Sequence, residues 1–174
     1  RDTDYIEFLE ESVTNHRVLF FTDSGNCYGI TCKDIPEGKW RDKGVQLTSI
    51  LPGFEKTERI VGVICVDNFD ILKEAEPYIQ FYTQEGMIKR TQLREYDSRV
   101  TKIQAVELSH GNRDILLATE KGMSIRFKSS EVNPTGRATI GVKAIQLKKN
   151  DHVVFAREID DEGELVVVTN RGFA

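Results

Sequence analysis

The chain has 174 residues, of which 39% are hydrophobic and 30% charged, so it can form one domain with a core or an array of small repeats. It has no apolar run long enough to span a bilayer and no signal-peptide pattern, so we expect a cytoplasmic protein without a membrane partner. Three cysteines without a CxxC spacing argue against disulfides and a zinc site, and 24 basic against 28 acidic residues give a net charge of −4, which taken alone argues against nucleic-acid binding.

Four segments along the chain share one pattern: an apolar run, a threonine three residues before a glycine, and a second apolar run. They are residues 18–28, 78–90, 115–127 and 165–174, with Thr22, Thr83, Thr119 and Thr169 before Gly25, Gly86, Gly122 and Gly172. Each segment predicts a β-hairpin in which the glycine takes the positive φ that closes the turn. The first strand of each hairpin is apolar on both faces, which indicates burial between neighbouring sheets.

A second pattern relates residues 43–64 to residues 141–156, and its later half recurs at 99–106. Together the two patterns give about four strands per unit, the size of one propeller blade. We therefore predict an all-β domain of about four repeat units. The units are residues 1–65, 66–106, 107–156 and a truncated 157–174. Only residues 70–76 favour a short helix, and since the chain begins at Arg1 and stops within a repeat, we expect it to be a piece of a longer polypeptide.

The spacing of the turn glycines is uneven. It is 61 residues from Gly25 to Gly86, 36 from Gly86 to Gly122 and 50 from Gly122 to Gly172, so the unit after Gly86 is 14 residues shorter than the last. What this unit lacks is a counterpart of residues 141–149, and a blade that lost such a strand would leave its neighbour unpaired. We expect either a missing segment at the Ser98–Arg99 junction or a deletion there.

Several motifs, in this order and spacing, resemble the C-terminal domain of the DNA gyrase A subunit over essentially the whole chain. They are residues 4–6, 19–28, 35–37, 43–44, 58–60, 86–91, 122–127, 135–136 and 141–142. The resemblance implies a β-pinwheel, which is a propeller-like ring of four-stranded blades with a strand swapped between neighbours. A related, shorter domain belongs to the A subunit of topoisomerase IV, and the basic box that separates the two would lie before Arg1.

The resemblance also implies a function. The domain would be non-catalytic and would bind, bend and wrap double-stranded DNA without strong sequence specificity, presenting it to the cleavage core of a bacterial type IIA topoisomerase. It would need no cofactor itself, because ATP and Mg²⁺ act elsewhere in an A2B2 assembly with the ATPase B subunit. Steering of substrate choice in topoisomerase IV is the alternative function, and a cytoplasmic, nucleoid-associated location follows from either.

A surface that bends DNA needs cations spaced to meet successive phosphates. Such cations follow the turn glycines and occupy the long loops, and the repeat predicts that they form an interrupted band along one rim. The candidate DNA-binding residues are Lys33, Lys39, Arg41, Lys43, Lys89, Arg90, Arg94, Arg126, Lys128, Arg137 and Lys143. The negative net charge would then come from acidic clusters at residues 2–11, 67–76 and 158–164, on another face or in exposed loops.

Other functions find less support in the sequence. His16, His110 and His152 are isolated from cysteine or aspartate at ligand spacing, and no catalytic triad, P-loop or dinucleotide motif occurs. Tyrosines 5, 28, 78, 82 and 96 lie in strand-like segments, where packing is the expected role. Trp40 stands between the basic residues Lys39 and Arg41, and it either packs on DNA or covers the core. A propeller used as a protein-interaction scaffold stays open as an alternative, and so does an enzyme built on a propeller.

Overall fold

The computed structural model of the chain describes residues 5–39, 41–66, 77–93, 103–109, 111–136, 139–160, 162 and 165–168. Its strands form three antiparallel sheets, here called blades A, B and C, with the orders β2-β1-β3, β6-β4-β5-β9 and β10-β7-β8. The strands are β1 (Arg17–Thr22), β2 (Cys27–Thr31), β3 (Ile60–Val66), β4 (Tyr78–Thr83), β5 (Met87–Gln92), β6 (Ile103–Ser109), β7 (Asp114–Thr119), β8 (Ser124–Lys128), β9 (Val142–Lys143) and β10 (Val153–Ile159). The helical segments are η1 (Cys32–Asp34), η4 (Ser129–Glu131) and α1 (Leu47–Ile50), and the sequence did not predict α1. The all-β fold is confirmed.

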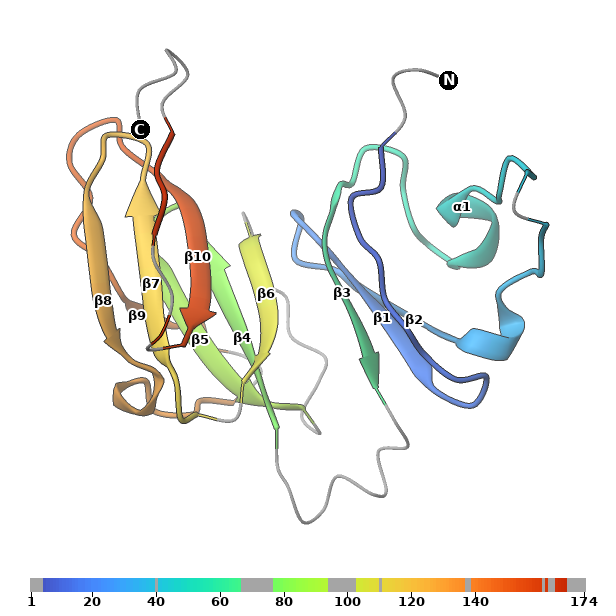
Figure 1. Ribbon diagram of the computed structural model, residues 1–174, viewed down its shortest axis with the longest axis horizontal. Helices are drawn as coiled ribbons and strands as arrows, with labels where there is room; N and C mark the ends of the chain where they lie inside the picture. Colours follow the sequence, from blue (N-terminus) through green and yellow to red (C-terminus); the bar gives the residue numbers. More distant parts are fainter. Residues whose placement is uncertain are drawn as a thin grey trace.

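The blades stand side by side, with blade B between the other two (Figure 1). Strand β6 contacts both β3 and β10, so the inner edges of the three blades lie next to one another. The opposite, outer edges are formed by β2, β9 and β8. Loops that leave β2 and β8 therefore start at the outer edge of the molecule.

The repeated hairpin folds as its sequence predicts. In each described hairpin the glycine N–H donates to the carbonyl of the turn threonine, at 2.9 Å for Gly25 and 3.0 Å for Gly86 and Gly122, and each glycine has φ between 75° and 83°. The threonine hydroxyl accepts a further backbone N–H from four residues on, as Thr83 Oγ1 does from Met87 N at 3.1 Å. These local bonds explain why the pattern recurs. The turn of the fourth hairpin lies outside the described residues.

The joint between blades A and B is apolar. Leu19 and Phe21 of β1 pack with Ile79 and Phe81 of β4, and the two phenylalanine rings meet edge to face with centroids 5.6 Å apart. All four side chains are at most 3% exposed. Because successive residues of a strand point to opposite faces, a strand buried on both faces is one that lies between two layers. The predicted burial of the first hairpin strand is confirmed for β1, β4 and β7.

The joint between blades B and C combines an apolar part with a polar seam. Tyr82 and Ile88 of blade B pack against Ile115 and Leu117 of blade C. Beside them lies the polar seam, which consists of Gln80, Tyr82, Glu107, Ser109 and Glu158. Glu158 is only 8% exposed and accepts hydrogen bonds from Gln80 Nε2 at 2.6 Å and from the Ser109 hydroxyl. Glu107 accepts from the Tyr82 hydroxyl and, at 2.7 Å, from the backbone N–H of Glu158.

The buried Glu158 corrects a prediction. It opens the acidic cluster 158–164, which the sequence placed on an exposed face or loop, but β10 carries it into the joint. Asp160 and Glu162 of the same cluster are exposed, as expected. The physical reason for the difference is register: Glu158 lies opposite Ile115 in the ladder and so shares the face that packs against blade B.

A short strand is exchanged between blades C and B. Strand β9 comes from the chain that follows β8 of blade C, but it pairs with β5 of blade B, Ile88 opposite Val142 and Met87 opposite Lys143. Gly141 makes this approach possible, because a Cβ at this position would lie 2.4 Å from the carbonyl oxygen of Ile88. The swapped strand that the resemblance implied is therefore present at this joint.

The fourth hairpin differs from the other three. Residues 165–168 match the buried first strands in sequence, yet within the described residues they pair with no strand and their side chains are 49–74% exposed. Leu165 borders a groove of about 570 Å³ on the free face of blade C, together with Leu116 and Phe155. The Ser98–Arg99 junction and residues 70–76 lie outside the described residues.

Candidate nucleic-acid interface

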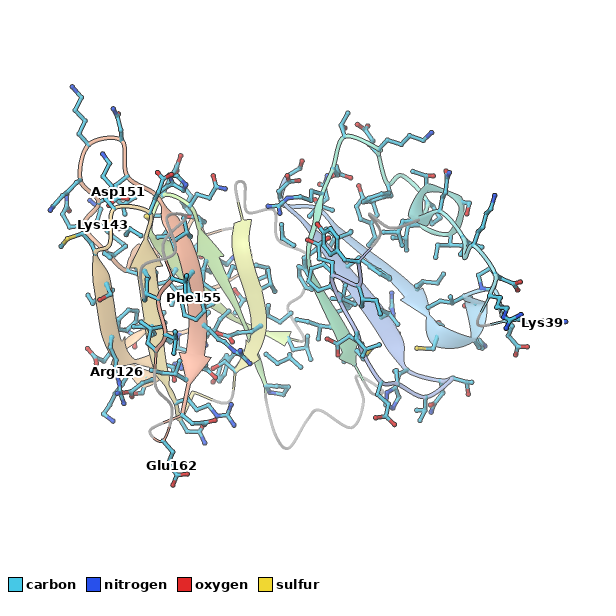
Figure 2. The ribbon with its side chains drawn as sticks, turned by 45° about the horizontal axis from the view of Figure 1, so that its top comes forward. Lys39, Arg126, Lys143, Asp151, Phe155 and Glu162 are labelled. Carbon is cyan, nitrogen blue, oxygen red and sulfur yellow. The ribbon has the colours of Figure 1, made fainter. Side chains whose placement is uncertain are left out.

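The loop that leaves the outer edge of blade A carries four of the candidate cations. Lys33 lies in η1, and Lys39, Arg41 and Lys43 lie between η1 and α1; all four are exposed. A turn shapes the loop at this point, because Asp42 Oδ2 accepts from Lys39 N at 2.7 Å and Asp42 N donates to the carbonyl of Lys39 at 2.8 Å. Figure 2 shows Lys39 at one end of the molecule with its side chain directed away from the blades.

The chain segment that leaves blade C and crosses to the outer edge of blade B carries Lys143. This residue lies on β9, is exposed, and its Nζ is 3.4 Å from the side-chain oxygen of Gln146. In Figure 2 it lies near Asp151, at the opposite end of the molecule from Lys39. The exposed candidates therefore lie at the outer edge of blade A, in the loop after η1, and at the outer edge of blade B, on β9.

Three exposed lysines of blade C and of the loop before β10 were missed in the sequence. Lys121, Lys148 and Lys149 are exposed and gather where the β7–β8 turn meets the loop before β10. Lys121 Nζ donates to the carbonyl of Lys149 at 2.6 Å, and Lys121 N donates to Asp151 at 3.1 Å. The adjacent pair 148–149 and the lysine inside the turn are signals that the sequence carried, but their proximity depends on the fold.

Lys89 and Arg90 are not on the rim, and their prediction as exposed cations is wrong. Lys89 is 1% and Arg90 6% exposed, because β5 lies between the neighbouring blades and is covered at its edge by β9. Lys89 points toward blade A with its Nζ 6.0 Å from the Phe81 ring centroid. The Arg90 guanidinium lies over the Tyr78 ring at 4.7 Å and donates to the carbonyl of Ser129 at 2.9 Å. Side chains of a blade strand face the neighbouring blades, so they do not point outward along the radius.

Arg126 and Lys128 are solvent-accessible but paired. Both lie on β8 and meet Asp114 of β7, Arg126 Nε at 2.7 Å and Lys128 Nζ at 3.8 Å. The hydrogen bond from Arg126 holds the pKa of Asp114 below its ordinary value. The two cations are therefore partly neutralised on the face of blade C, and Arg126 also borders the groove beside Leu116. Arg94, Arg137, Trp40 and His110 lie outside the described residues.

Most of the described tyrosines and histidines have structural partners, but Tyr5 is 81% exposed and lies in no strand, so its predicted packing role is not observed. The Tyr28 hydroxyl donates to Glu58 at 2.7 Å, and burial together with this carboxylate raises the pKa of Tyr28 to about 12. Burial also raises the pKa of Tyr82, which donates to Glu107. Nδ1 of His152 is 3.4 Å from Glu120. Among the described residues no group of three or more histidine, cysteine, aspartate or glutamate side chains is placed to hold a metal ion, and no helix there is long and apolar enough to cross a membrane.

Comparison with known families identifies the fold. The family model described as "DNA gyrase C-terminal domain, beta-propeller" matches residues 16–67 and 113–160, more than half of the chain. The chain belongs to this family. The resemblance predicted from the sequence is confirmed, and the two matched stretches contain blades A and C. Strands β4, β5 and β6 of blade B lie in the unmatched stretch between them, whereas its fourth strand, β9, lies within the second matched stretch.

Relatives and solved structures agree with this assignment. The chain is 34% identical over 187 aligned residues to the DNA gyrase A subunit of Staphylococcus epidermidis, covering 99% of the chain and 20% of that protein. It is 29% identical over 185 residues to the DNA topoisomerase 4 A subunit of Bacillus subtilis, covering 99% and 22%. A crystal structure of the C-terminal domain of DNA topoisomerase IV matches with a TM-score of 0.76 and 28% identity, over 86% of this chain and 49% of that one. The chain spans about a fifth of the length of the curated relatives it matches.

Proposed function

We propose that this chain is a non-catalytic domain that binds and bends double-stranded DNA as part of the A subunit of a bacterial type IIA topoisomerase. Membership of the gyrase A C-terminal family supports the proposal. The observation that carries it is the placement of Lys39, Arg41, Lys43 and Lys143. The first three project from a loop and Lys143 projects from the edge strand β9, where a duplex can reach them, while the cations of β5 are enclosed.

The mechanism is electrostatic. Exposed lysine and arginine side chains neutralise phosphates and release condensed counterions, which favours binding without reading bases. A duplex that contacts both the loop of blade A and Lys143 on β9 passes from the outer edge of one blade to that of the next, and these contacts offset the cost of bending it around the domain. The net charge of −4 resides elsewhere, in exposed acids such as Glu7, Glu10 and Glu162. Binding is therefore local and falls steeply with salt.

The larger assembly belongs to the same proposal. The domain presents bent DNA to a cleavage core in the rest of the A subunit, and an ATPase B subunit with ATP and Mg²⁺ completes an A2B2 enzyme in the cytoplasm. Steering of substrates without tight wrapping, as a topoisomerase IV domain, is the second candidate. The TM-score of 0.76 to a topoisomerase IV domain favours it, whereas the 34% identity to a gyrase A subunit favours wrapping.

A charge-reversal experiment on the full-length protein tests DNA contact. The variant Lys39→Glu with Arg41→Glu should lose affinity for duplex DNA, and the slope of log affinity against log salt should fall by about 0.9 for each phosphate that is no longer neutralised. The matched control is Lys56→Glu with Arg59→Glu, which changes the net charge equally at positions between α1 and β3. Equal slopes for both variants and the unmodified protein would refute the proposed contact.

A second measurement separates the two candidates. The end-to-end distance of a duplex shorter than the DNA persistence length of about 150 base pairs reports bending directly. Strong shortening on binding supports wrapping of the gyrase type. Binding with an unchanged end-to-end distance supports the steering role.

A further inference from the structure

Arg90 is a buried cation at the joint between blades B and C. It lies on β5 opposite Gln80 of β4 and is 6% exposed. Its Nη1 donates to the carbonyl of Ser129 at 2.9 Å, and the guanidinium plane is supported by the Tyr78 ring, 4.7 Å away. Ser129 begins η4 and is itself fully buried. The side chain of Arg90 therefore holds the start of the chain that leaves blade C.

The main chain of Arg90 holds the same segment a second time. The described residues 129–136 and 139–147, here called the crossover strap, run from η4 through β9. The carbonyl of Arg90 accepts from Thr135 N at 2.8 Å, and two residues earlier Ile88 pairs with Val142. Arg90 of blade B thus contacts the strap at its beginning, Ser129, and at its middle, Thr135. Next to these contacts, the ladder between β5 and β9 fixes the later part of the strap.

The surroundings of the guanidinium are shaped to admit it. Gly111 has φ +75°, and a Cβ on this residue would lie 2.8 Å from Nη1 of Arg90. The Nε of Arg90 is buried and has no hydrogen-bond partner among the described residues. Burying a guanidinium with incomplete hydrogen bonding is costly, so the contacts with Ser129 and Tyr78 have to offset that cost. A cation that bound phosphate would have to be exposed.

An arginine side chain reaches the corresponding place in each of the other two blades, from the same strand position in blade C and from a neighbouring strand in blade A. The ladders place Arg126 of blade C and Gly29 of blade A at the register position of Arg90. Gly29 leaves room for Arg17, whose guanidinium occupies the space 2.8 Å from where the Cβ would stand. Arg126 reaches Asp114 at 2.7 Å. A guanidinium thus lies over the same part of each blade, although the strand that supplies it differs.

We propose that Arg90 is a positioning residue, which fixes the crossover strap and the exposed Lys143 on it against blade B and does not itself contact DNA. Its action on the strap is independent of any ligand, and only the consequence for DNA rests on the proposed function. Arg90 holds the strap, which leaves blade C, on β5 of blade B. It therefore sets where Lys143 lies relative to the exposed lysines of blade C.

Hydrogen exchange of the full-length protein without DNA tests the positioning role. Arg90→Met should accelerate exchange of the strap amides, Thr135 among them, by at least about tenfold, the factor that corresponds to the loss of one hydrogen bond from a charged donor. The matched control is Lys89→Met, the preceding buried cation on the opposite face of β5, which should leave the strap unchanged. Unchanged exchange in Arg90→Met, or equal acceleration in both variants, overturns the proposal.

A milder pair of variants keeps the test decisive if Arg90→Met does not fold. Tyr78→Leu removes the ring beneath the guanidinium and keeps the charge, and Arg90→Lys keeps the charge and removes the planar fork. Both variants should accelerate hydrogen exchange in the same peptides of the strap, and hydrogen exchange in blade A should not change. Strap exchange at the rate of the unmodified protein in both variants would contradict the positioning role.

A double-mutant cycle on DNA affinity separates positioning from direct contact. If Arg90 acts through the strap, the losses from Arg90→Met and Lys143→Gln are less than additive, because both remove the same interaction with DNA. A direct phosphate contact gives additive losses and overturns the proposal. If the unmodified protein binds no DNA, the proposed function fails, whereas hydrogen exchange still decides the role of Arg90.

Discussion

The exchanged strand β9 depends on a glycine, and replacing this glycine should detach it. Gly141 has φ +97°, and a Cβ there would lie 2.4 Å from the carbonyl oxygen and 3.0 Å from the carbonyl carbon of Ile88. Gly122 provides a matched control. It has φ +77°, but nothing lies within 4 Å of its Cβ position. Alanine at either position meets the same kind of backbone strain, and only at position 141 does it also meet a neighbouring strand.

The expected losses follow from these contacts. Placing an L-residue at positive φ costs about 1–2 kcal/mol, which is the whole expected effect of Gly122→Ala. In Gly141→Ala the strap must also move away from Ile88 and give up its pairing with β5, at about 1 kcal/mol for each backbone hydrogen bond. We therefore expect a loss of about 3–4 kcal/mol for Gly141→Ala, still below the typical stability of a domain.

Urea unfolding followed by circular dichroism measures both losses as free energies of unfolding. Hydrogen exchange of residues 142–144 should rise in Gly141→Ala and stay unchanged in Gly122→Ala, because only the former loses the ladder. Equal losses in the two variants, within about 0.5 kcal/mol, would refute the close approach of β9 to β5.

Two further substitutions test the polar seam and the face of blade C. Burial raises the pKa of Glu107, so the folded protein holds this proton more tightly than the unfolded chain, and stability is lost as pH rises above the ordinary value of 4.5. Glu107→Gln keeps an acceptor for Tyr82 and should flatten this part of the profile of unfolding free energy against pH; a profile like that of the unmodified protein would contradict the burial of the charge. Asp114→Asn removes the acid that pairs with Arg126 and Lys128, so DNA affinity measured by fluorescence anisotropy should rise, and an unchanged affinity would exclude both cations from the interface.

The repeated hairpin was predictable because its interactions are local. The turn threonine, the glycine and the amide four residues on are close in sequence, and three described turns repeat the same bonds. The apolar first strand also predicted its own burial, since a run that is apolar on both faces needs a layer on each side. Both predictions required knowledge of only a few neighbouring residues.

The burial of β4 did not by itself reveal the burial of the cations on β5. In blade C the strand β8 pairs with the equally buried β7 and still exposes Arg126 and Lys128. A basic pair after a turn looks exposed only when the second strand is taken to be an edge. Strand β9 covers that edge, and its two residues pair with residues more than 50 positions earlier, which no local pattern reveals.

Glu158 was unpredictable for a related reason. It stands in an acid-rich stretch, which is typical of an exposed loop, and its burial depends on partners 49 and 78 residues away in sequence, Ser109 and Gln80. The cations of the loop after η1, Lys39, Arg41 and Lys43, were easier, because a loop at an outer edge has solvent on at least one side. Sequence reasoning therefore located exposed loop charges better than it located strand charges.

The two joints of the domain differ in a way that bears on the proposed bending of DNA. Apolar contacts between Phe21 and Phe81 are not directional, so the joint between blades A and B specifies packing but tolerates small rotations. The seam between blades B and C is directional, because the hydrogen bonds to Glu158 and the contact of Arg90 with Ser129 each require one geometry. A rotation at this seam would leave buried polar groups unpaired, at about 1–3 kcal/mol for each group. If the path of DNA follows the loop cations, its curvature is held most firmly between blades B and C, where Arg90 and the strap lie.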